Sequence, residues 1–224
     1  MKKILALLLF AVAALALPVH GIAFPGCVES STSDNCTVST NQAITPELHN
    51  SVFFYNTFTI NPGVTVTVQP TPTVPKNGGN ITIRAKQINI GGTINANSGA
   101  TDPSWTLNGG NGGFITLVSK NHLFLGVNSV LNARGANGVV ASCIAGNGGT
   151  GGNVVIQTVA GASVTQLGTI NVSGGIGAVI PASCGNSTTL VNGTNGGSGS
   201  FTPNSGFTLS VVDFSIADSL FIST

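Results

Sequence analysis

Carboxylates are the residues of this sequence whose chemistry is easiest to judge, because so few of them are present. Glycoside hydrolysis normally needs two carboxylates that face one another across the scissile bond. Beyond residue 21 the acidic residues are Glu29, Asp34, Glu47, Asp102, Asp213 and Asp218. No two of them occupy equivalent positions in neighbouring sequence repeats. We therefore expect no catalytic residue, and a polysaccharide-degrading enzyme is the less favoured alternative.

Metal, phosphate and nucleic-acid chemistry find little support either. The four cysteines lack the close pairing that a zinc site requires. Glycine runs such as GGNGG and GNGGTGG lack the Lys-Ser/Thr ending of a phosphate-binding loop, so we interpret these glycines as turn residues. Charged residues make up only 6% of the chain, with no basic patch for a phosphate backbone. We expect no metal, no cofactor and no nucleic-acid partner.

The N-terminus has the pattern of a secretory signal. Met1-Lys2-Lys3 is followed by an apolar run from Ile4 to Leu17 and by a small residue, Gly21, at a suitable cleavage site. The run is too short to be a convincing transmembrane helix. We expect residues 1–21 to form a signal helix that is cleaved, which leaves an extracellular or cell-surface chain without stable membrane insertion. An even number of cysteines in an exported chain favours two disulfides.

Internal repeats indicate the elements that must position the remaining residues. Three segments align: GGNITIRAKQINIGGTINANSG from Gly78, GGFITLVSKNHLFLGVNSVLNARG from Gly112 and GGNVVIQTVAGASVTQLGTINVSG from Gly151. The alignment places apolar residues in columns separated by one residue, the period of a strand with one buried face. These columns are Ile81–Ile115–Val154, Ile83–Leu117–Ile156, Ile94–Leu131–Ile170 and Ala96–Ala133–Val172.

One repeat holds two or three short strands and cannot bury its apolar face alone, whereas stacked repeats bury their columns against each other. We therefore predict an all-β fold, a single-stranded parallel β-helix, whose strands pair between coils about 4.8 Å apart. Parallel crossovers are overwhelmingly right-handed, so we expect a right-handed helix. A β-sandwich is the main competitor, but its strands need not repeat turn glycines and core columns in order.

One outward column is predicted to read Thr65, Asn95, Asn132 and Asn171. Stacked asparagine side chains stabilise such columns through their amides. The column is not a continuous row of threonines, which argues against an ice-binding face.

Segments of the form GG-N-I-T-I followed by I-N-I-GG-T-I-N-A-N-S-G resemble the glycine-rich right-handed β-helix repeats of secreted bacterial and archaeal surface proteins. The resemblance covers roughly Phe58 to Gly175 and continues in degenerate form toward the C-terminus. It implies an extracellular location and an elongated rod. It supplies no catalytic residue, because this repeat style is specific for architecture and carries many functions.

The chain divides into four segments by these criteria. After the signal peptide (1–21) we expect an N-terminal cap with a local disulfide (22–57) and coils with loops along one edge (58–206). The last segment (207–224) is expected to be a C-terminal strand that caps its own last coil or is donated to a neighbouring subunit.

The repeat alignment also predicts how the cysteines pair. Cys143 and Cys184 follow the equivalent core residues Leu131 and Ile170 at similar distances, so stacking would bring them together. That leaves Cys27 to pair with Cys36, which is close in sequence. A sandwich has no reason to place Cys143 near Cys184.

These observations favour a secreted, non-catalytic structural or adhesive surface protein that acts as a rod, matrix or fibre subunit. Its expected partners are other copies of itself, joined end to end or by a donated strand, and glycans. The alternative is a carbohydrate-binding module that uses the loop edge near Trp105, the candidate ligand contact. Asn186 and Asn192, in the longest loop, are the best candidates for N-glycosylation.

Overall fold

The computed structural model describes residues 23–27, 35–184 and 192–202, which all belong to the unit Ile22–Thr208. The expected signal peptide (1–21), the expected C-terminal strand (207–224) and Asn186 lie outside the described residues.

Short strands make up nearly all the regular structure, so the all-β prediction holds. The strands are β1 (Asn35–Val38), β2 (Gln42–Ile44), β3 (Val52–Ile60), β4 (Thr65–Val68), β5 (Asn80–Ile90), β6 (Thr93–Asn95), β7 (Phe114–Leu125), β8 (Val130–Asn132), β9 (Val140–Ala141), β10 (Ile144–Ala145), β11 (Asn153–Thr158), β12 (Ser163–Gln166), β13 (Thr169–Asn171) and β14 (Ser200–Thr202). Two short 3-10 turns, η1 (Pro46–Leu48) and η2 (Ala182–Cys184), complete the described elements.

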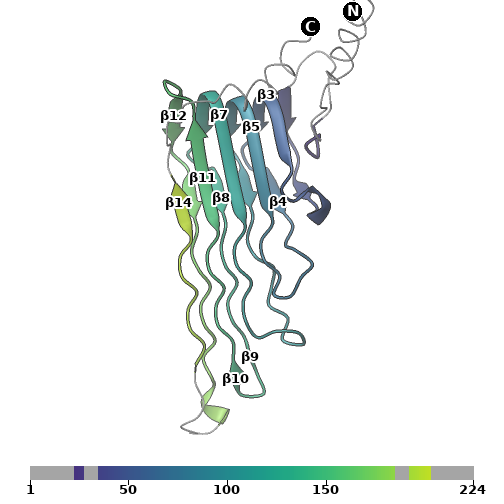
Figure 1. Ribbon diagram of the computed structural model, residues 1–224, viewed down its shortest axis with the longest axis vertical. Coiled ribbons are helices and arrows are strands. Elements are labelled where there is room, and N and C mark those ends of the chain that lie inside the picture. Colours follow the sequence, from purple (N-terminus) through teal and green to yellow (C-terminus); the bar gives the residue numbers. More distant parts are fainter. Residues whose placement is uncertain (1–22, 28–34, 185–191, 203–224) are drawn as a thin grey trace, which may run out of the picture. The chain divides into compact units, whose positions relative to one another are not determined.

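The chain alternates between two parallel sheets. One sheet has the order β1-β3-β5-β7-β11-β14, with β12 paired to β7, and the other has the order β13-β8-β6-β4-β2. Each passage through both sheets is called a circuit here; the circuits span residues 35–51, 52–79, 80–113, 114–152 and 153–199. Because each strand pairs with its equivalent in the next circuit, neighbouring strands in space come from successive circuits (Figure 1).

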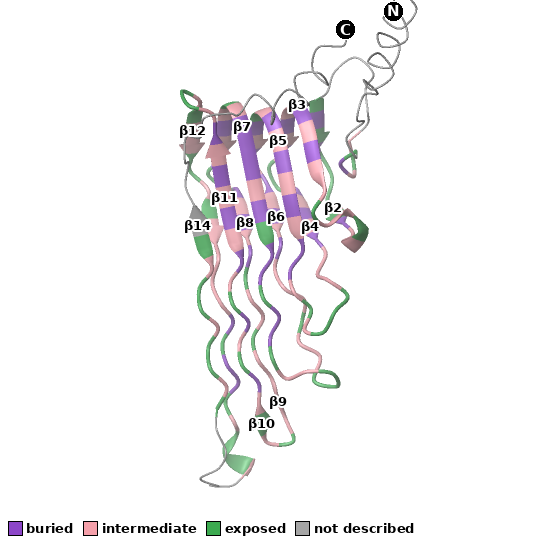
Figure 2. Ribbon diagram, viewed as in Figure 1, coloured by how far each residue is buried: buried purple, intermediate pink, exposed green. Residues whose placement is uncertain are grey.

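The core lies between the two sheets and follows the predicted columns. Ile81 pairs with Ile115, and Ile115 with Val154, while Ile94 pairs with Leu131 and Leu131 with Ile170. Side chains alternate between buried and partly exposed along β5, β11 and most of the other core strands (Figure 2). This alternation buries one face of each sheet against the other and leaves the opposite face to solvent.

The predicted register is wrong at one position of the asparagine column. Thr67 pairs with Asn95, and Thr65 pairs with Thr93, so Thr65 does not belong to the asparagine column. The connection before β4 is longer than its counterpart before β6, because Gly63 makes a turn with φ of 78° and Val64 is buried beyond it.

The boundary expected between cap and coils, at residues 57 and 58, falls inside the continuous strand β3. The segment expected to be a cap supplies β1 and β2, which pair in parallel with β3 and β4. Within the described part of the chain, the stacked circuits therefore include residues from Asn35 on, because the apolar residues of this segment align with the core columns: Cys36 pairs with Phe58, and Val38 with Ile60.

Beyond the second sheet, the chain extends into long glycine-rich arms before it returns to the first sheet. The arms comprise residues 96–113, 133–152 and 172–199, the last described as far as 184 and again from 192. Figure 1 shows them running side by side away from the strands. Apart from the small β9–β10 hairpin and η2, their described residues belong to neither strands nor helices.

The hydrogen bonds of the arms repeat every three residues. In the returning half of the second arm, three successive N–H groups donate in three different directions. The first donates to the next circuit, the second to the outgoing half of the same arm, and the third to the preceding circuit. These bonds run from Gly148 to the carbonyl of Thr194 (2.8 Å), from Gly149 to the carbonyl of Ala136 (2.8 Å) and from Thr150 to Oδ1 of Asn111 (2.9 Å). Gly151, Gly152 and Asn153 repeat the three directions. Three residues per turn is the period of the polyproline II conformation, whose backbone makes no internal hydrogen bonds.

This packing, rather than turn formation, explains the glycine runs, so their interpretation as turn residues is wrong. Positive φ among the described glycines is confined to Gly26, Gly63 and Gly161, none of them in an arm. A Cβ on Gly149 would overlap the carbonyl group of Gly110, and one on Gly112 would overlap the carbonyl of Ala133. Glycine is required because the backbones lie too close together for any side chain.

Asparagine side chains add bonds between circuits at regular positions. Oδ1 of an asparagine accepts a hydrogen bond from a backbone N–H of the next circuit, at 2.7–3.2 Å. The acceptors are Asn35, Asn41, Asn77, Asn80, Asn97, Asn108, Asn111, Asn137, Asn147 and Asn153. In the predicted asparagine column, Oδ1 of Asn95 and Oδ1 of Asn171 instead each accept a hydrogen bond from the backbone N–H two residues further along the chain.

The arm packing predicts a difference between two glycines. Gly149→Ala should lower the free energy of unfolding by about 1–3 kcal/mol, because its Cβ has no space among neighbouring backbones. Gly197→Ala, whose Cβ would meet nothing within 4 Å, should change it by less than about 1 kcal/mol. Urea denaturation of both variants measures the difference, and equal stabilities would contradict the close packing of the arms.

Candidate functional site

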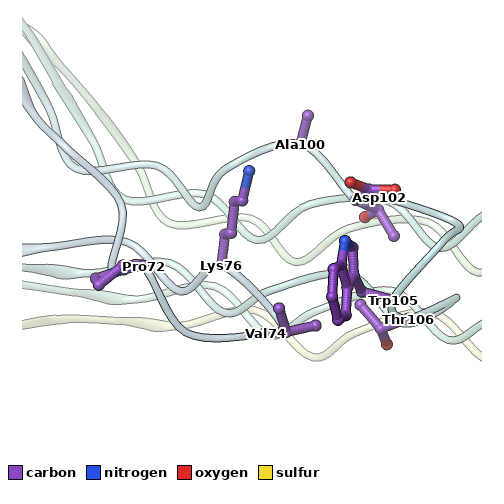
Figure 3. Close-up of a pocket in the computed structure, with 8 residues that line it drawn as sticks. Pro72, Val74, Lys76, Ala100, Asp102, Trp105 and Thr106 are labelled. Atoms are coloured by element: carbon purple, nitrogen blue, oxygen red, sulfur yellow. The ribbon is translucent and has the colours of Figure 1, made fainter.

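A surface pocket lies where the first arm meets the proline-rich connection 69–79. It has a volume of about 330 Å³. Figure 3 shows side chains from both segments bordering it, with Trp105 on one side and Lys76 and Val74 on the other. The lining residues are Pro72, Val74, Lys76, Ala100, Thr101, Asp102, Trp105 and Thr106. The expected ligand contact, Trp105, therefore belongs to a pocket built from two successive circuits.

Local hydrogen bonds hold the arm side of the pocket. The carbonyl of Asp102 accepts from the N–H groups of Trp105 and Thr106, each at 3.0 Å. Oδ1 of Asp102 accepts from the N–H of Ser104 at 2.9 Å, the turn that an aspartate side chain makes with its own backbone. These bonds fix the tight turn that carries the indole ring, while Trp105 itself is 76% exposed.

Neighbouring segments anchor this turn on both sides. Thr101 Oγ1 donates to the carbonyl of Asn137 at 2.7 Å in the second arm. The N–H of Val139 donates to the carbonyl of Leu107 at 2.9 Å. On the other side, the N–H of Gly99 donates to the carbonyl of Lys76 at 2.8 Å. The pocket walls are therefore tied to the hydrogen-bonded arms.

The prolines of the opposite wall explain its irregular path. The segment QPTPTVPKNGG lies outside the described strands, as expected for a stretch that lacks several backbone donors. The N–H of Thr71 donates to the carbonyl of Asn77 at 2.8 Å and closes the loop. Pro72, Val74 and Lys76 lie on the exposed side of this loop and face the first arm.

The pocket combines one aromatic face with a few polar groups. Its groups are one indole face, one ammonium, one carboxylate, the Thr101 and Thr106 hydroxyls, and aliphatic surface from Pro72 and Val74. Asp102 is the single carboxylate among these lining residues, so the facing pair used in glycoside hydrolysis is not assembled here. Among the described residues, no three His, Cys, Asp or Glu side chains gather to hold a metal ion.

Two disulfides join the cysteines in the predicted pairing. Cys143 and Cys184 link the second and third arms, with Cα atoms 5.6 Å apart. Cys143 lies in the two-residue turn of the β9–β10 hairpin, where Ser142 and Cys143 have φ of 49° and 60°, the signs that a type I′ turn requires. Cys27 and Cys36 form the second bond, with Cα atoms 5.2 Å apart. Two such bonds indicate an oxidising environment.

Two described Asn-x-Ser/Thr sequences, at Asn192 and Asn80, differ in their surroundings. Asn192 is exposed and its Oδ1 accepts the N–H of Ile180 at 2.8 Å. Asn80 lies at the start of β5, and its Nδ2 donates to Oδ1 of Asn50 at 2.9 Å. The acceptor nitrogen of glycosylation is thus engaged at Asn80.

No protein-family model matches the chain, and neither a curated protein nor a solved structure is detectably similar to it. Among the described residues, no helix has the length and apolar character needed to cross a membrane.

Of the residues that line the pocket, only Trp105 is predicted from the sequence as a ligand contact. Asp102 enters the sequence argument only as one of the few acidic residues, and the sequence gives no prediction for Lys76 or Val74. The hydrogen-bonded arms are not predicted either. A signal for the arms was present: Asn77-Gly-Gly-Asn80, Asn108-Gly-Gly-Asn111 and Asn147-Gly-Gly-Thr150 share a period of three. No comparable pattern marks Lys76, because its partners in the pocket come from another circuit.

The disulfide between the arms predicts a loss of stability on its removal. The double variant Cys143→Ser, Cys184→Ser should be up to about 4 kcal/mol less stable, since the bond closes a loop of 41 residues. Urea denaturation measures the loss, and Ser142→Ala in the same turn is the control that keeps the bond. Peptide mapping without reduction that linked Cys27 to Cys143 would refute the pairing.

Glycosylation should distinguish the exposed from the engaged asparagine. Expressed in a host with N-glycosylation machinery, the protein should carry a glycan at Asn192 and none at Asn80, because Asn192 is exposed whereas the amide nitrogen of Asn80 is hydrogen-bonded to Asn50. Mass spectrometry of glycopeptides, with Asn192→Gln as the negative control, measures site occupancy. Full occupancy of Asn80 with Asn192 bare would contradict the surroundings described for these residues.

Proposed function

We propose that this chain is a secreted, non-catalytic structural or adhesive surface protein, built as a single-stranded right-handed parallel β-helix. Alternation of the chain between two parallel sheets supports the architecture, and the strong preference of parallel crossovers for one hand supports its handedness. The signal-like N-terminus and the two disulfides support an extracellular location.

The observation that carries the adhesive function is the set of arms. They extend from the stacked strands and are bonded to one another along the backbone, and Cys143–Cys184 cross-links the second arm to the third. Exposed apolar side chains are found on all three arms: Trp105 (76%), Ile144 (61%), Ile176 (63%) and Val179 (69%). A rigid projection that bears exposed apolar groups is suited to contact with another surface.

The pocket favours carbohydrate as the kind of surface that is contacted. An exposed tryptophan beside a few polar groups is a common arrangement for ligand recognition. An enzyme that degrades polysaccharides finds less support, because Asp102 has no second carboxylate among the residues around it.

Adhesion without catalysis is directly testable. Beads that carry the mature protein should be retained on at least one insoluble polysaccharide among cellulose, chitin and peptidoglycan, and should release no reducing sugar. Albumin-coated beads are the control for nonspecific retention. Release of soluble sugar would establish an enzyme instead. Absence of both retention on these surfaces and filaments in negative-stain microscopy would refute the structural or adhesive function.

A further inference from the structure

The indole of Trp105 presents a large apolar face to solvent beside a pocket. Tryptophan is usually well buried in folded proteins, so an exposed fraction of 76% at a held turn is informative. The backbone that carries the ring is held in place by the hydrogen bonds to the carbonyl of Asp102 and by the bond from Thr101 to the second arm. An aromatic ring in this position offers area for contact at a low entropic cost.

The polar groups of the pocket complement hydroxyl groups. The Lys76 ammonium is solely a hydrogen-bond donor and the Asp102 carboxylate solely an acceptor, whereas a hydroxyl group is both. Figure 3 shows Lys76 and Asp102 near the same rim of the pocket, across from the aliphatic side chain of Val74. A ligand with hydroxyl groups at its edge and an apolar face would satisfy both charged groups and the indole together.

Charge balance narrows the ligand class further. The charges of the single positive and the single negative group that line the pocket cancel. The local electrostatic field therefore adds no affinity for a polyanion or for a cation. Lys76 would repel a quaternary ammonium that the indole and Asp102 could otherwise attract. A neutral ligand avoids both penalties.

The volume and rigidity of the pocket set the size of the ligand. Its volume of about 330 Å³ is at the lower end for ligand sites, which suits one or two sugar rings and not a long chain. Both walls are anchored by hydrogen bonds to backbone carbonyls, which the N–H of Gly99, the hydroxyl of Thr101 and the N–H of Val139 donate. Anchored walls reduce the entropy lost on binding.

We propose that this pocket binds a neutral, hydroxyl-rich pyranose unit, stacked on Trp105 and hydrogen-bonded to Lys76 and Asp102. The inference rests on the adhesive function proposed for the chain and names its ligand class. The sugar would be a terminal or exposed unit of a surface glycan, since the indole on which it stacks is 76% exposed.

The chain contains a single tryptophan, so intrinsic fluorescence reports on this pocket alone. The mature protein is titrated with methyl glucoside, methyl galactoside, methyl mannoside and N-acetylglucosamine, and with galacturonate and glucosamine as charged counterparts. Calorimetry runs in parallel. At least one neutral sugar should bind with millimolar or tighter affinity and change the fluorescence, and its charged counterparts should bind about tenfold more weakly.

Variants separate the pocket from the rest of the surface. Trp105→Ala should weaken binding about tenfold, as measured by calorimetry. Trp105→Phe should restore part of the affinity. Lys76→Ala and Asp102→Asn should each weaken binding, the latter without losing the acceptor for the Ser104 N–H. Val127→Ala, at a residue 71% exposed and outside the pocket, is the matched control and should bind as the wild type does. Circular dichroism verifies that each variant is folded.

Three results would overturn the proposal: no neutral sugar binds, a charged sugar binds more tightly, or folded Trp105→Ala binds as well as the wild type. The bead experiment distinguishes this failure from that of the broader function. Beads that still adhere while the titrations are negative would refute the pyranose site alone. Beads that release sugar would refute the non-catalytic function.

Discussion

The close approach of one backbone to another is the constraint on which this structure depends. In the arms, N–H and C=O groups bond to neighbouring segments in three directions, and a buried backbone group without such a partner would be costly. The approach is possible only where the residues lack a Cβ, as at Gly112 and Gly149. Glycine normally weakens a fold through the entropy of the unfolded chain, and here the bonds that it permits offset that cost.

The two halves of each circuit are therefore held by different interactions. The strands are held by apolar columns such as Ile83–Leu117–Ile156, in addition to their ladder hydrogen bonds. The arms are held by backbone bonds and by asparagine side chains such as Asn108 and Asn111, which accept from the next circuit. The strands set the spacing between circuits, and the arms inherit it, so that Cys143 and Cys184 lie within disulfide distance.

This division explains what the sequence could predict. Strand columns follow from alternation between apolar and polar residues, which is a local pattern with a known period, and the cysteine pairing follows from the alignment of successive repeats. The position of Thr65 was mistaken because extra residues before β4 shift the register, and nothing local in FTINPGVTVTV reveals the shift. The arms carry no apolar alternation, so the sequence pattern does not distinguish their glycines from turn residues. The pocket brings Lys76 and Trp105 together from different circuits, and only the stacking defines that proximity.

The location of the pocket follows from the same constraint. Where backbones lie in contact, as at Gly109 and Gly110, there is no space for side chains and no chemistry other than that of the backbone. Between Gly99 and Gly109 the glycine pattern stops, and the residues with distinctive side chains, Asp102 and Trp105, occur within that interval. The arms thus provide a rigid base, and function is confined to the intervals that close packing leaves open. The intervals around Ile144 and Val179 in the other arms have the same character, because exposed apolar side chains also occur there between glycine-rich segments.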